Sequence, residues 1–247
     1  IIICKIMIKK FYLFFLISGC VIDKNVSMDG FEFLPIKSEK YEIATWQKIQ
    51  DKNSDVHIYI EGDGYAFNAS GRPSNNPTPR GTLMRDLANK DTNKNVVYIA
   101  RPCQFIMGDN CNYTDWTTGR FSQDIINSMS LVVKKVAGNK PVVLIGYSGG
   151  AMISGLVIQE NPNIKVKKWI TIAGMLNHSE WTEFFGDIPL KDSKNLYELP
   201  NVVQVHYVGD KDKVVPIELS KRWLNGKNIV VVNGAGHADF ENLDIDF

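Results

Sequence analysis

The sequence predicts one α/β domain, with a mostly parallel central sheet, helices on both faces and no separate cap domain. Two observations support this fold class. Several strand-like segments are apolar throughout, as strands buried on both faces of a sheet are. Segments with helical spacing separate them, which is typical of parallel sheets. Polar and glycine-rich stretches follow the strands, so we expect a site where the carboxyl ends of the strands meet.

The elements follow one another along residues 41–247, which we assign to this domain. A lead-in strand is expected at 41–48, and 56–60 (Val-His-Ile-Tyr-Ile) reads as the first buried strand. Apolar residues recur at helical spacing within 121–136. The further strands are expected at 96–100, 142–145, 169–172, 202–208 and 229–232, and the further helices at 82–89, 151–158 and 217–224. The stretch between the strands at 169–172 and 202–208 is too short for a cap domain.

Composition and charge exclude several classes of protein. Hydrophobic residues make up 44% and charged residues 22%, values that an ordinary globular chain has. The 28 basic and 27 acidic residues nearly cancel, and no basic block could follow a phosphate backbone, so no nucleic-acid partner is expected. The four cysteines lack the spacing of a zinc site, and Gly62 and Gly64 do not extend into a nucleotide-binding loop. We therefore expect no metal and no cofactor.

Residues 1–19 resemble a bacterial lipoprotein signal peptide. Lys9 and Lys10 precede the apolar run 11–18, which is far shorter than the ~20 residues of a membrane span. The tetrapeptide Ile-Ser-Gly-Cys that ends at Cys20 resembles the lipobox, whose cysteine is lipidated. The alternatives are an ordinary signal with a chance cysteine, or a buried strand. A lipid on Cys20 would hold the protein at a bilayer of the cell envelope, at the outer membrane or the periplasmic face, with 20–40 as a linker.

Two further cysteines lie in one loop. Cys103 and Cys111 are eight residues apart. In an exported protein two such cysteines are expected to form a disulfide, because the compartment is oxidising. The alternative is a pair of free buried thiols.

The candidate nucleophile is Ser148, in the Gly-Tyr-Ser-Gly-Gly stretch at 146–150. Gly-x-Ser-x-Gly alone is a weak signal, but here an apolar strand precedes it and a helix follows it. This is the context of a nucleophile elbow, where a sharp turn exposes the serine and its neighbours must be small. The alternative is a glycine-rich turn with an inert serine.

A serine needs a base to take its proton and an acid to orient that base. His237 lies in the flexible loop after the last strand, and Asp212 follows the penultimate strand, with Asp210 as the second choice for the acid. The order Ser148, Asp212, His237 is that of α/β-hydrolases and differs from the orders in chymotrypsin and subtilisin.

On these residues the chain resembles an α/β-hydrolase from about residue 55 to its end. The stretch 209–216 resembles the family's Gly-x-x-Asp-x-x-Val-Pro and assigns the acid to Asp212. The resemblance implies an oxyanion hole made by the N–H of Gly149 and that of Asp63, with Gly64 as the second choice. Asp63 departs from the His-Gly of many members, and its charge would oppose the oxyanion unless its side chain points away or is paired. The stretches 61–64, 101–104 and 116–122 resemble a poorly characterised bacterial subgroup.

The expected function is that of a serine hydrolase of the cell envelope, which cleaves the carboxylic ester or thioester bond of a small acyl substrate through an acyl-enzyme on Ser148. Two alternatives stay open: a non-catalytic binding lipoprotein on a hydrolase fold, and a serine peptidase. Candidates for the pocket lining are Tyr65, Phe67, Trp116, Trp181 and Phe184, and His178 is a weaker candidate. Three cations, Arg101, Arg120 and Lys211, are candidates to bind an anionic group, but each is expected instead to be an ordinary surface or loop-fixing charge.

Overall fold

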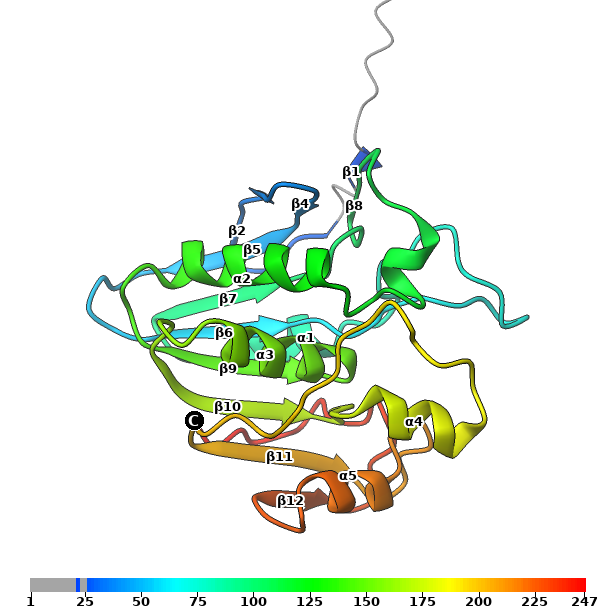
Figure 1. Cartoon of the computed structure of the whole chain (residues 1–247). Helices are drawn as coiled ribbons and strands as arrows, with labels where there is room; N and C mark the ends of the chain where they lie inside the picture. The colour runs from blue at the N-terminus through cyan, green and yellow to red at the C-terminus, as the bar shows by residue number, and fades with distance from the viewer. Residues whose placement is uncertain (1–20, 23–25) are drawn as a thin grey trace, which may run out of the picture.

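The protein is built on an eight-stranded sheet. A computed structural model describes residues 21–22 and 26–247 of the chain (Figure 1). The strands lie in the order β12 (Ile229–Val232), β11 (Gln204–Gly209), β10 (Val166–Ile172), β9 (Val142–Tyr147), β6 (Val56–Ile60), β7 (Asn95–Ile99), β5 (Thr45–Ile49) and β2 (Glu32–Phe33). Neighbours from β12 to β7 are parallel, whereas β5 and β2 are added antiparallel. This mostly parallel sheet confirms the predicted fold class.

Helices cover both faces of the sheet. The helices α2 (Gln123–Ala137) and α3 (Gly149–Glu160) lie in front of it in Figure 1. The helix α1 (Leu83–Lys90) packs on the opposite face. Strand β6 shows the division, because Ile58 and Ile60 pack with α2 and α3 while Tyr59 packs with α1. A strand that is buried on both faces needs apolar side chains throughout, which explains the unbroken apolar runs in the sequence.

Most predicted elements are present, with ends that differ by a few residues. The expected strand 41–48 is two strands, β4 (Glu42–Ile43) and β5, separated by one residue. Several short elements were not predicted: β3 (Ile36–Lys37), β8 (Ile106–Met107), the 3-10 helix η1 (Tyr113–Trp116) and α4 (His178–Phe185). Elements of two to four residues are too short to show a periodic pattern. The helix α4 begins after Asn177, whose side chain caps it by accepting hydrogen bonds from two N–H groups of its first turn.

The expected linker 20–40 differs most from the structure. Strand β1 (Val21–Ile22) pairs antiparallel with β8, β2 joins the main sheet, and β3 pairs with β4. Strand β2 lies at the edge of the main sheet, whereas β1 and β3 belong to separate two-stranded sheets. Each of the three is two residues long, too short to leave a pattern in the sequence. The predicted signal peptide 1–19 and the predicted lipid site Cys20 lie outside the described residues.

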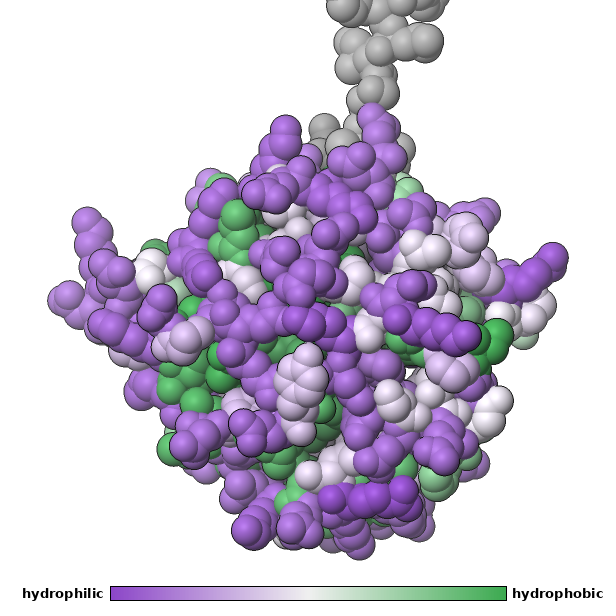
Figure 2. Space-filling model, viewed as in Figure 1, coloured by the Kyte–Doolittle hydropathy of each residue, from purple (hydrophilic) through white to green (hydrophobic). Residues whose placement is uncertain are grey.

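The carboxyl ends of the parallel strands meet at one edge of the sheet, where the arrowheads of β6, β9, β10 and β11 point in Figure 1. Between β10 and β11 the chain holds α4 and loops, and no cap domain. The helix α5 (Ile217–Trp223) follows β11. The face seen in Figure 2 is mostly hydrophilic, with hydrophobic residues in small separate groups. Among the described residues, no helix is both long enough and apolar enough to span a bilayer.

Candidate active site

Ser148 lies at a sharp turn between β9 and α3. Its backbone has φ 51° and ψ −121°, a conformation that non-glycine residues rarely adopt. The glycines around it allow close packing. A Cβ at Gly150 would lie 2.5 Å from the carbonyl oxygens of Ile60 and Glu61, and one at Gly146 would lie 2.5 Å from the carbonyl oxygen of Gly150. The glycines of the motif are therefore required by contact, and the turn is the nucleophile elbow that the sequence predicts.

The structure brings the three residues of the predicted relay together. Ser148 Oγ lies 3.0 Å from His237 Nε2, and His237 Nδ1 lies 2.8 Å from Asp212 Oδ2. The second carboxylate oxygen of Asp212 accepts hydrogen bonds from the N–H groups of Val214 at 2.8 Å and Val215 at 2.9 Å. With Nδ1–H donating to Asp212, Nε2 is left free to accept the proton of Ser148.

Two contacts that the sequence did not predict hold the loop of His237. Asp210, the second choice for the acid, does not face His237; its carboxylate accepts a hydrogen bond from the N–H of Gly234 at 2.6 Å. This bond joins the loop after β11 to the loop after β12. The hydroxyl of Tyr147 donates to the carbonyl oxygen of His237 at 3.2 Å, and the two rings lie 5.2 Å apart. Asp210 and Tyr147 are therefore positioning residues.

The loop after β6 packs against the nucleophile. Ile60 pairs with Gly146 in the sheet, so β6 ends beside the elbow. A Cβ at Gly62 would lie 3.2 Å from Ser148 Cβ. The N–H groups of Asp63 and Gly149 donate no hydrogen bond to any described residue. Two unpartnered N–H groups beside a serine are the arrangement that an oxyanion hole requires.

Gly64 is needed for the shape of this loop. Its φ is +64°, and a Cβ there would lie 2.1 Å from the carbonyl oxygen of Pro77. Glycine is therefore required at this position, because a side chain would clash with the Pro77 carbonyl and strain the backbone.

The carboxylate of Asp63 is paired. Arg101 Nη1 lies 2.9 Å from Asp63 Oδ1, and Arg120 Nε lies 3.3 Å from Asp63 Oδ2. Arg101 is fixed from a second side, since its Nη2 donates to the carbonyl oxygen of Arg120. Burial lowers the pKa of Arg101, although the neighbouring Asp63 acts in the opposite direction. The negative charge beside the two unpartnered N–H groups is thus balanced by two buried cations, a role that the sequence does not predict for them.

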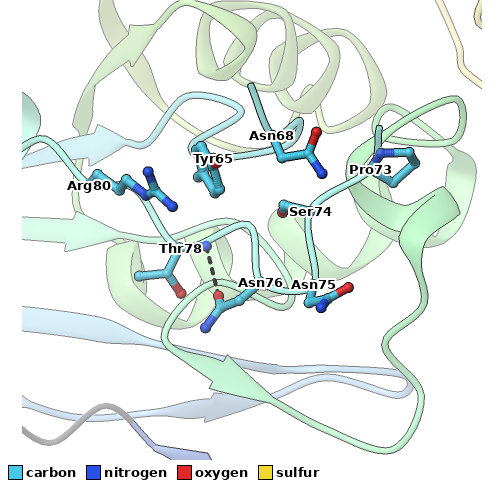
Figure 3. Close-up of a pocket in the computed structure, with 8 residues that line it drawn as sticks. All are labelled: Tyr65, Asn68, Pro73, Ser74, Asn75, Asn76, Thr78 and Arg80. Atoms are coloured by element: carbon cyan, nitrogen blue, oxygen red, sulfur yellow. Dashed lines mark hydrogen bonds between the residues drawn. The ribbon is translucent and has the colours of Figure 1, made fainter. Parts of the chain in front are cut away.

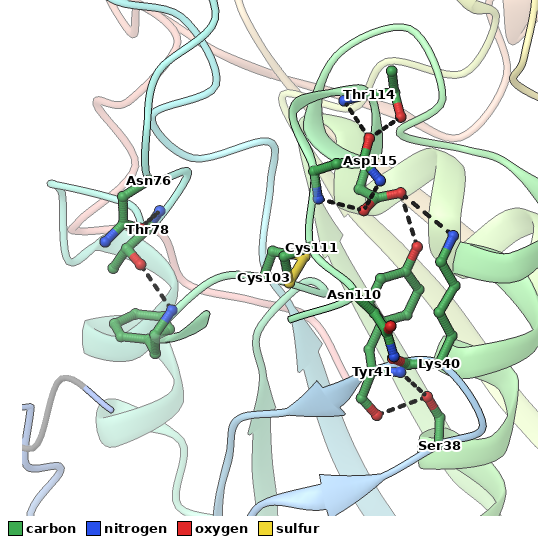
Figure 4. Close-up of a disulfide and its surroundings, with 12 residues drawn as sticks. Ser38, Lys40, Tyr41, Asn76, Thr78, Cys103, Asn110, Cys111, Thr114 and Asp115 are labelled. Carbon is green, nitrogen blue, oxygen red and sulfur yellow. Dashed lines mark hydrogen bonds and ion pairs between the residues drawn. A yellow bond between two sulfur atoms is a disulfide. The ribbon is translucent and has the colours of Figure 1, made fainter. Parts of the chain in front are cut away.

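A disulfide loop supports the same region. Cys103 and Cys111 form the predicted disulfide, with their Cα atoms 5.7 Å apart (Figure 4). The next residue, Gln104, donates from Nε2 to the carbonyl oxygen of Gly62 at 3.0 Å. Phe105 N–H donates to Thr78 Oγ1 at 2.7 Å, the contact drawn at the left of Figure 4. The disulfide loop therefore holds the chain next to Asp63.

A cavity of about 510 Å³ opens at Ser148 and His237. Its wall is mostly apolar and also contains charged groups; the other lining side chains include Tyr65, Ala66, Phe67, Pro79, Leu83, Tyr147, Trp181 and Val214, together with Asp63, Arg80 and Arg120. Three of the five aromatic residues that the sequence proposes for the lining are among these. Trp116 instead lies in the core, and Phe184 is exposed outside the cavity.

His178 does not line this cavity. It is buried, with its ring stacked on Phe121 at a centroid distance of 6.0 Å. Burial lowers its pKa. The weaker suggestion that His178 contacts substrate is therefore not supported by its position.

A second, polar cavity of about 450 Å³ adjoins the first (Figure 3). The two cavities share Tyr65 and Arg80, and the guanidinium of Arg80 lies 3.4 Å from the centre of the Tyr65 ring. Asn68, Ser74, Asn76 and Thr78 contribute polar groups to its wall. Within the described part of the chain, no cluster of three or more histidine, cysteine or acidic residues could hold a metal ion.

Comparisons with known proteins agree with this geometry. A family model described as "Serine hydrolase (FSH1)" matches residues 82–237. No curated protein matches the chain. An α/β serine hydrolase without a lid from Xanthomonas campestris is 14% identical, with 85% of this chain and 86% of that chain covered and a TM-score of 0.51.

Two further solved structures are similar to the chain. The naproxen esterase (carboxylesterase NP) from Bacillus subtilis is 11% identical, with 86% of this chain and 87% of that chain covered and a TM-score of 0.58. A putative lipase from Acinetobacter baumannii is 14% identical, with 87% and 88% covered and a TM-score of 0.60. At these identities the likeness concerns the fold.

Proposed function

Because the chain belongs to the FSH1 family of serine hydrolases, we propose that it cleaves carboxylic esters or thioesters through an acyl-enzyme on Ser148. The observation that carries the proposal is the relay from Ser148 through His237 to Asp212, with 3.0 Å and 2.8 Å between successive partners. The likeness to an esterase and a putative lipase supports an ester over a peptide.

In the first half of the reaction Ser148 Oγ attacks the acyl carbon. Its proton passes to His237 Nε2, and the charge that the imidazole gains is stabilised by Asp212. The alcohol or thiol then leaves with that proton, and the acyl group stays on Ser148. In the second half a water molecule gives its proton to His237 and attacks the acyl carbon, which releases the acid and restores Ser148.

The oxyanion that forms in each half needs donors. The N–H groups of Gly149 and Asp63 are proposed for this role, because neither is used by another described residue. Arg101 and Arg120 balance the carboxylate of Asp63, so the acid does not present an unpaired negative charge to the oxyanion. The departure from the His-Gly of other members is thus compatible with catalysis.

We further propose that the mature protein begins at a lipidated Cys20 and acts at the bacterial cell envelope. The lipobox-like stretch that ends at Cys20 supports this, and the Cys103–Cys111 disulfide suits an oxidising compartment. Mass spectrometry of the mature N-terminus tests the anchor: a diacylated Cys20 peptide is expected, and an unmodified N-terminus elsewhere would contradict it.

Fluorophosphonate labelling tests the chemistry. The protein that starts after Cys20 should take up one label on Ser148, and a Ser148→Ala variant with an unchanged circular dichroism spectrum should take up none. Hydrolysis of matched ester, thioester and peptide substrates then ranks the bond types. Well-folded wild type that does not label would favour a non-catalytic binding protein, and faster cleavage of peptides would favour a peptidase.

A further inference from the structure

We propose that this site selects acyl esters that carry a negative charge near the scissile bond, and that Arg120 binds this charge. The inference rests on the proposed ester hydrolysis and names the class of its substrate. It starts from a buried arginine that faces the same cavity as Ser148 and His237.

The position of Arg120 is fixed by packing. Only 5% of its side chain is exposed. Its guanidinium lies 5.6 Å from the Trp181 ring and 5.7 Å from the Phe121 ring. Aromatic faces stabilise a cation without using its N–H groups. The guanidinium is therefore held at the cavity wall with its hydrogen-bonding capacity still available.

The guanidinium of Arg120 forms an ion pair with Asp63 but no hydrogen bond to a described residue. Its Nε approaches Asp63 at 3.3 Å but does not meet the geometry of a hydrogen bond. Its terminal nitrogens donate to no acceptor within residues 26–247, whereas Arg101 donates from both of its terminal nitrogens. Of the nitrogens of Arg120, Nε is buried without a hydrogen bond, and the five N–H groups of a guanidinium suit an anionic group in the cavity. A ligand with an anionic group would satisfy them.

The balance of charge also favours an anion. Asp63 is a single carboxylate between two arginines. The other acid of the wall, Glu61, already accepts hydrogen bonds from the N–H of Gly62 at 2.9 Å and from the Tyr98 hydroxyl at 2.7 Å. Burial raises the pKa of Glu61.

A second cation lies at the rim of the cavity. Arg80 lies against the Tyr65 ring, as Figure 3 shows, and both residues line the mostly apolar cavity as well as the polar one. The polar cavity beside it offers amide and hydroxyl groups. The mostly apolar wall next to Ser148 suits an acyl chain, and the two arginines suit a carboxylate or phosphate on the same molecule.

The experiment compares matched esters on the full chain solubilised in detergent. One pair carries the charge on the acyl side: para-nitrophenyl hydrogen succinate and its neutral methyl ester. The other carries it on the alcohol side: butyryl glycerol phosphate and butyryl glycerol. In at least one pair the wild type should show a higher kcat/KM for the anionic member, and Arg120→Gln should lower the anionic-to-neutral ratio by about 10- to 100-fold.

Two variants serve as controls. Arg222→Gln removes an exposed arginine that pairs with Glu180 and does not line the cavity, so the ratio should not change. Arg120→Lys keeps the charge without the planar fork and should retain part of the preference. If Arg120→Gln does not fold, the proposal is tested by the anionic-to-neutral kcat/KM ratios of the wild type and Arg120→Lys.

Two results would overturn the proposal: no preference for the anionic member of either pair in the wild type, or an unchanged anionic-to-neutral ratio in Arg120→Gln, which includes equal slowing of both members. Equal slowing would assign Arg120 to the oxyanion or to the pairing of Asp63. Fluorophosphonate labelling of Ser148 separates these results from a failure of the proposed function, because it reports the activated serine whatever the charge of the substrate.

Discussion

His206 should make the protein less stable in mild acid, and His206→Gln should remove much of this dependence. The side chain lies in β11, two strands from the nucleophile strand, and only 1% of the residue is exposed. Nδ1 lies 2.8 Å from Thr171 Oγ1 and Nε2 lies 3.0 Å from Gln204 Oε1. Burial lowers the pKa of His206 from 6.5 to about 4, because the charged imidazole loses its hydration.

The sign and size of the effect follow from this difference. Above pH 6.5 the imidazole is neutral in both the folded and the unfolded chain, so its contribution to stability is fully present. As the pH falls from 6.5 to about 4, the unfolded chain binds a proton that the folded protein does not, and stability is lost. Because a tenfold change in proton affinity corresponds to about 1.4 kcal/mol, the loss should reach about 3 kcal/mol.

Urea denaturation at a series of pH values between 7 and 4 measures the effect. The free energy of unfolding is measured for the wild type and for His206→Gln at each pH. The test uses only how the difference between the two values changes with pH, because Gln can alter packing by the same amount at every pH. The difference should shift by about 3 kcal/mol in favour of the variant on acidification. Gln204→Glu should reduce the loss, since a carboxylate next to Nε2 favours the charged imidazole. Parallel pH curves for the wild type and His206→Gln would refute the reasoning.

Three further predictions concern the site. Asp212→Asn should lower kcat about 10⁴-fold because His237 loses its orientation, whereas Asp210→Asn, the matched control, should change kcat far less; equal losses would contradict the assignment of the acid. Gly149→Ala should leave a folded protein that labels poorly with fluorophosphonate, because its Cβ would lie 2.1 Å from a carboxylate oxygen of the loop after β6; normal labelling would argue against this packing. Replacing both cysteines of the disulfide by serine should lower the free energy of unfolding by about 2.5 kcal/mol in urea denaturation, and an unchanged midpoint would show that the loop is held by other contacts.

Much of the fold could be predicted because burial on both faces leaves a signature in a single segment. The run 142–145 reads as a strand without knowledge of its neighbours, and the strand β9 is there. The order of the strands leaves no such local signature. Nor do β1 and β3, whose pairing depends on partners elsewhere in the chain.

The site likewise contains residues that the sequence reveals and contacts that it does not. Ser148 is visible in the sequence because the elbow constrains five consecutive residues, and the loops that carry Asp212 and His237 follow strands that can be recognised. The pairing of Asp63 with Arg101 and Arg120 could not be seen, because it joins three separate loops. The same holds for the aromatic residues, since whether one lines the cavity or packs in the core depends on the direction of a loop in space.

The contact of the disulfide loop with Gly62 links the redox state of two cysteines to the loop beside Ser148. Gln104 follows one of the bridged cysteines directly and holds the carbonyl of Gly62, one residue before an N–H group proposed for the oxyanion. A chain with free thiols can form the sheet and the elbow, but the segment that carries Gln104 is then not fixed by a covalent bridge. Hydrolytic activity should therefore be lower in the reduced protein than in the oxidised one, even where both are folded.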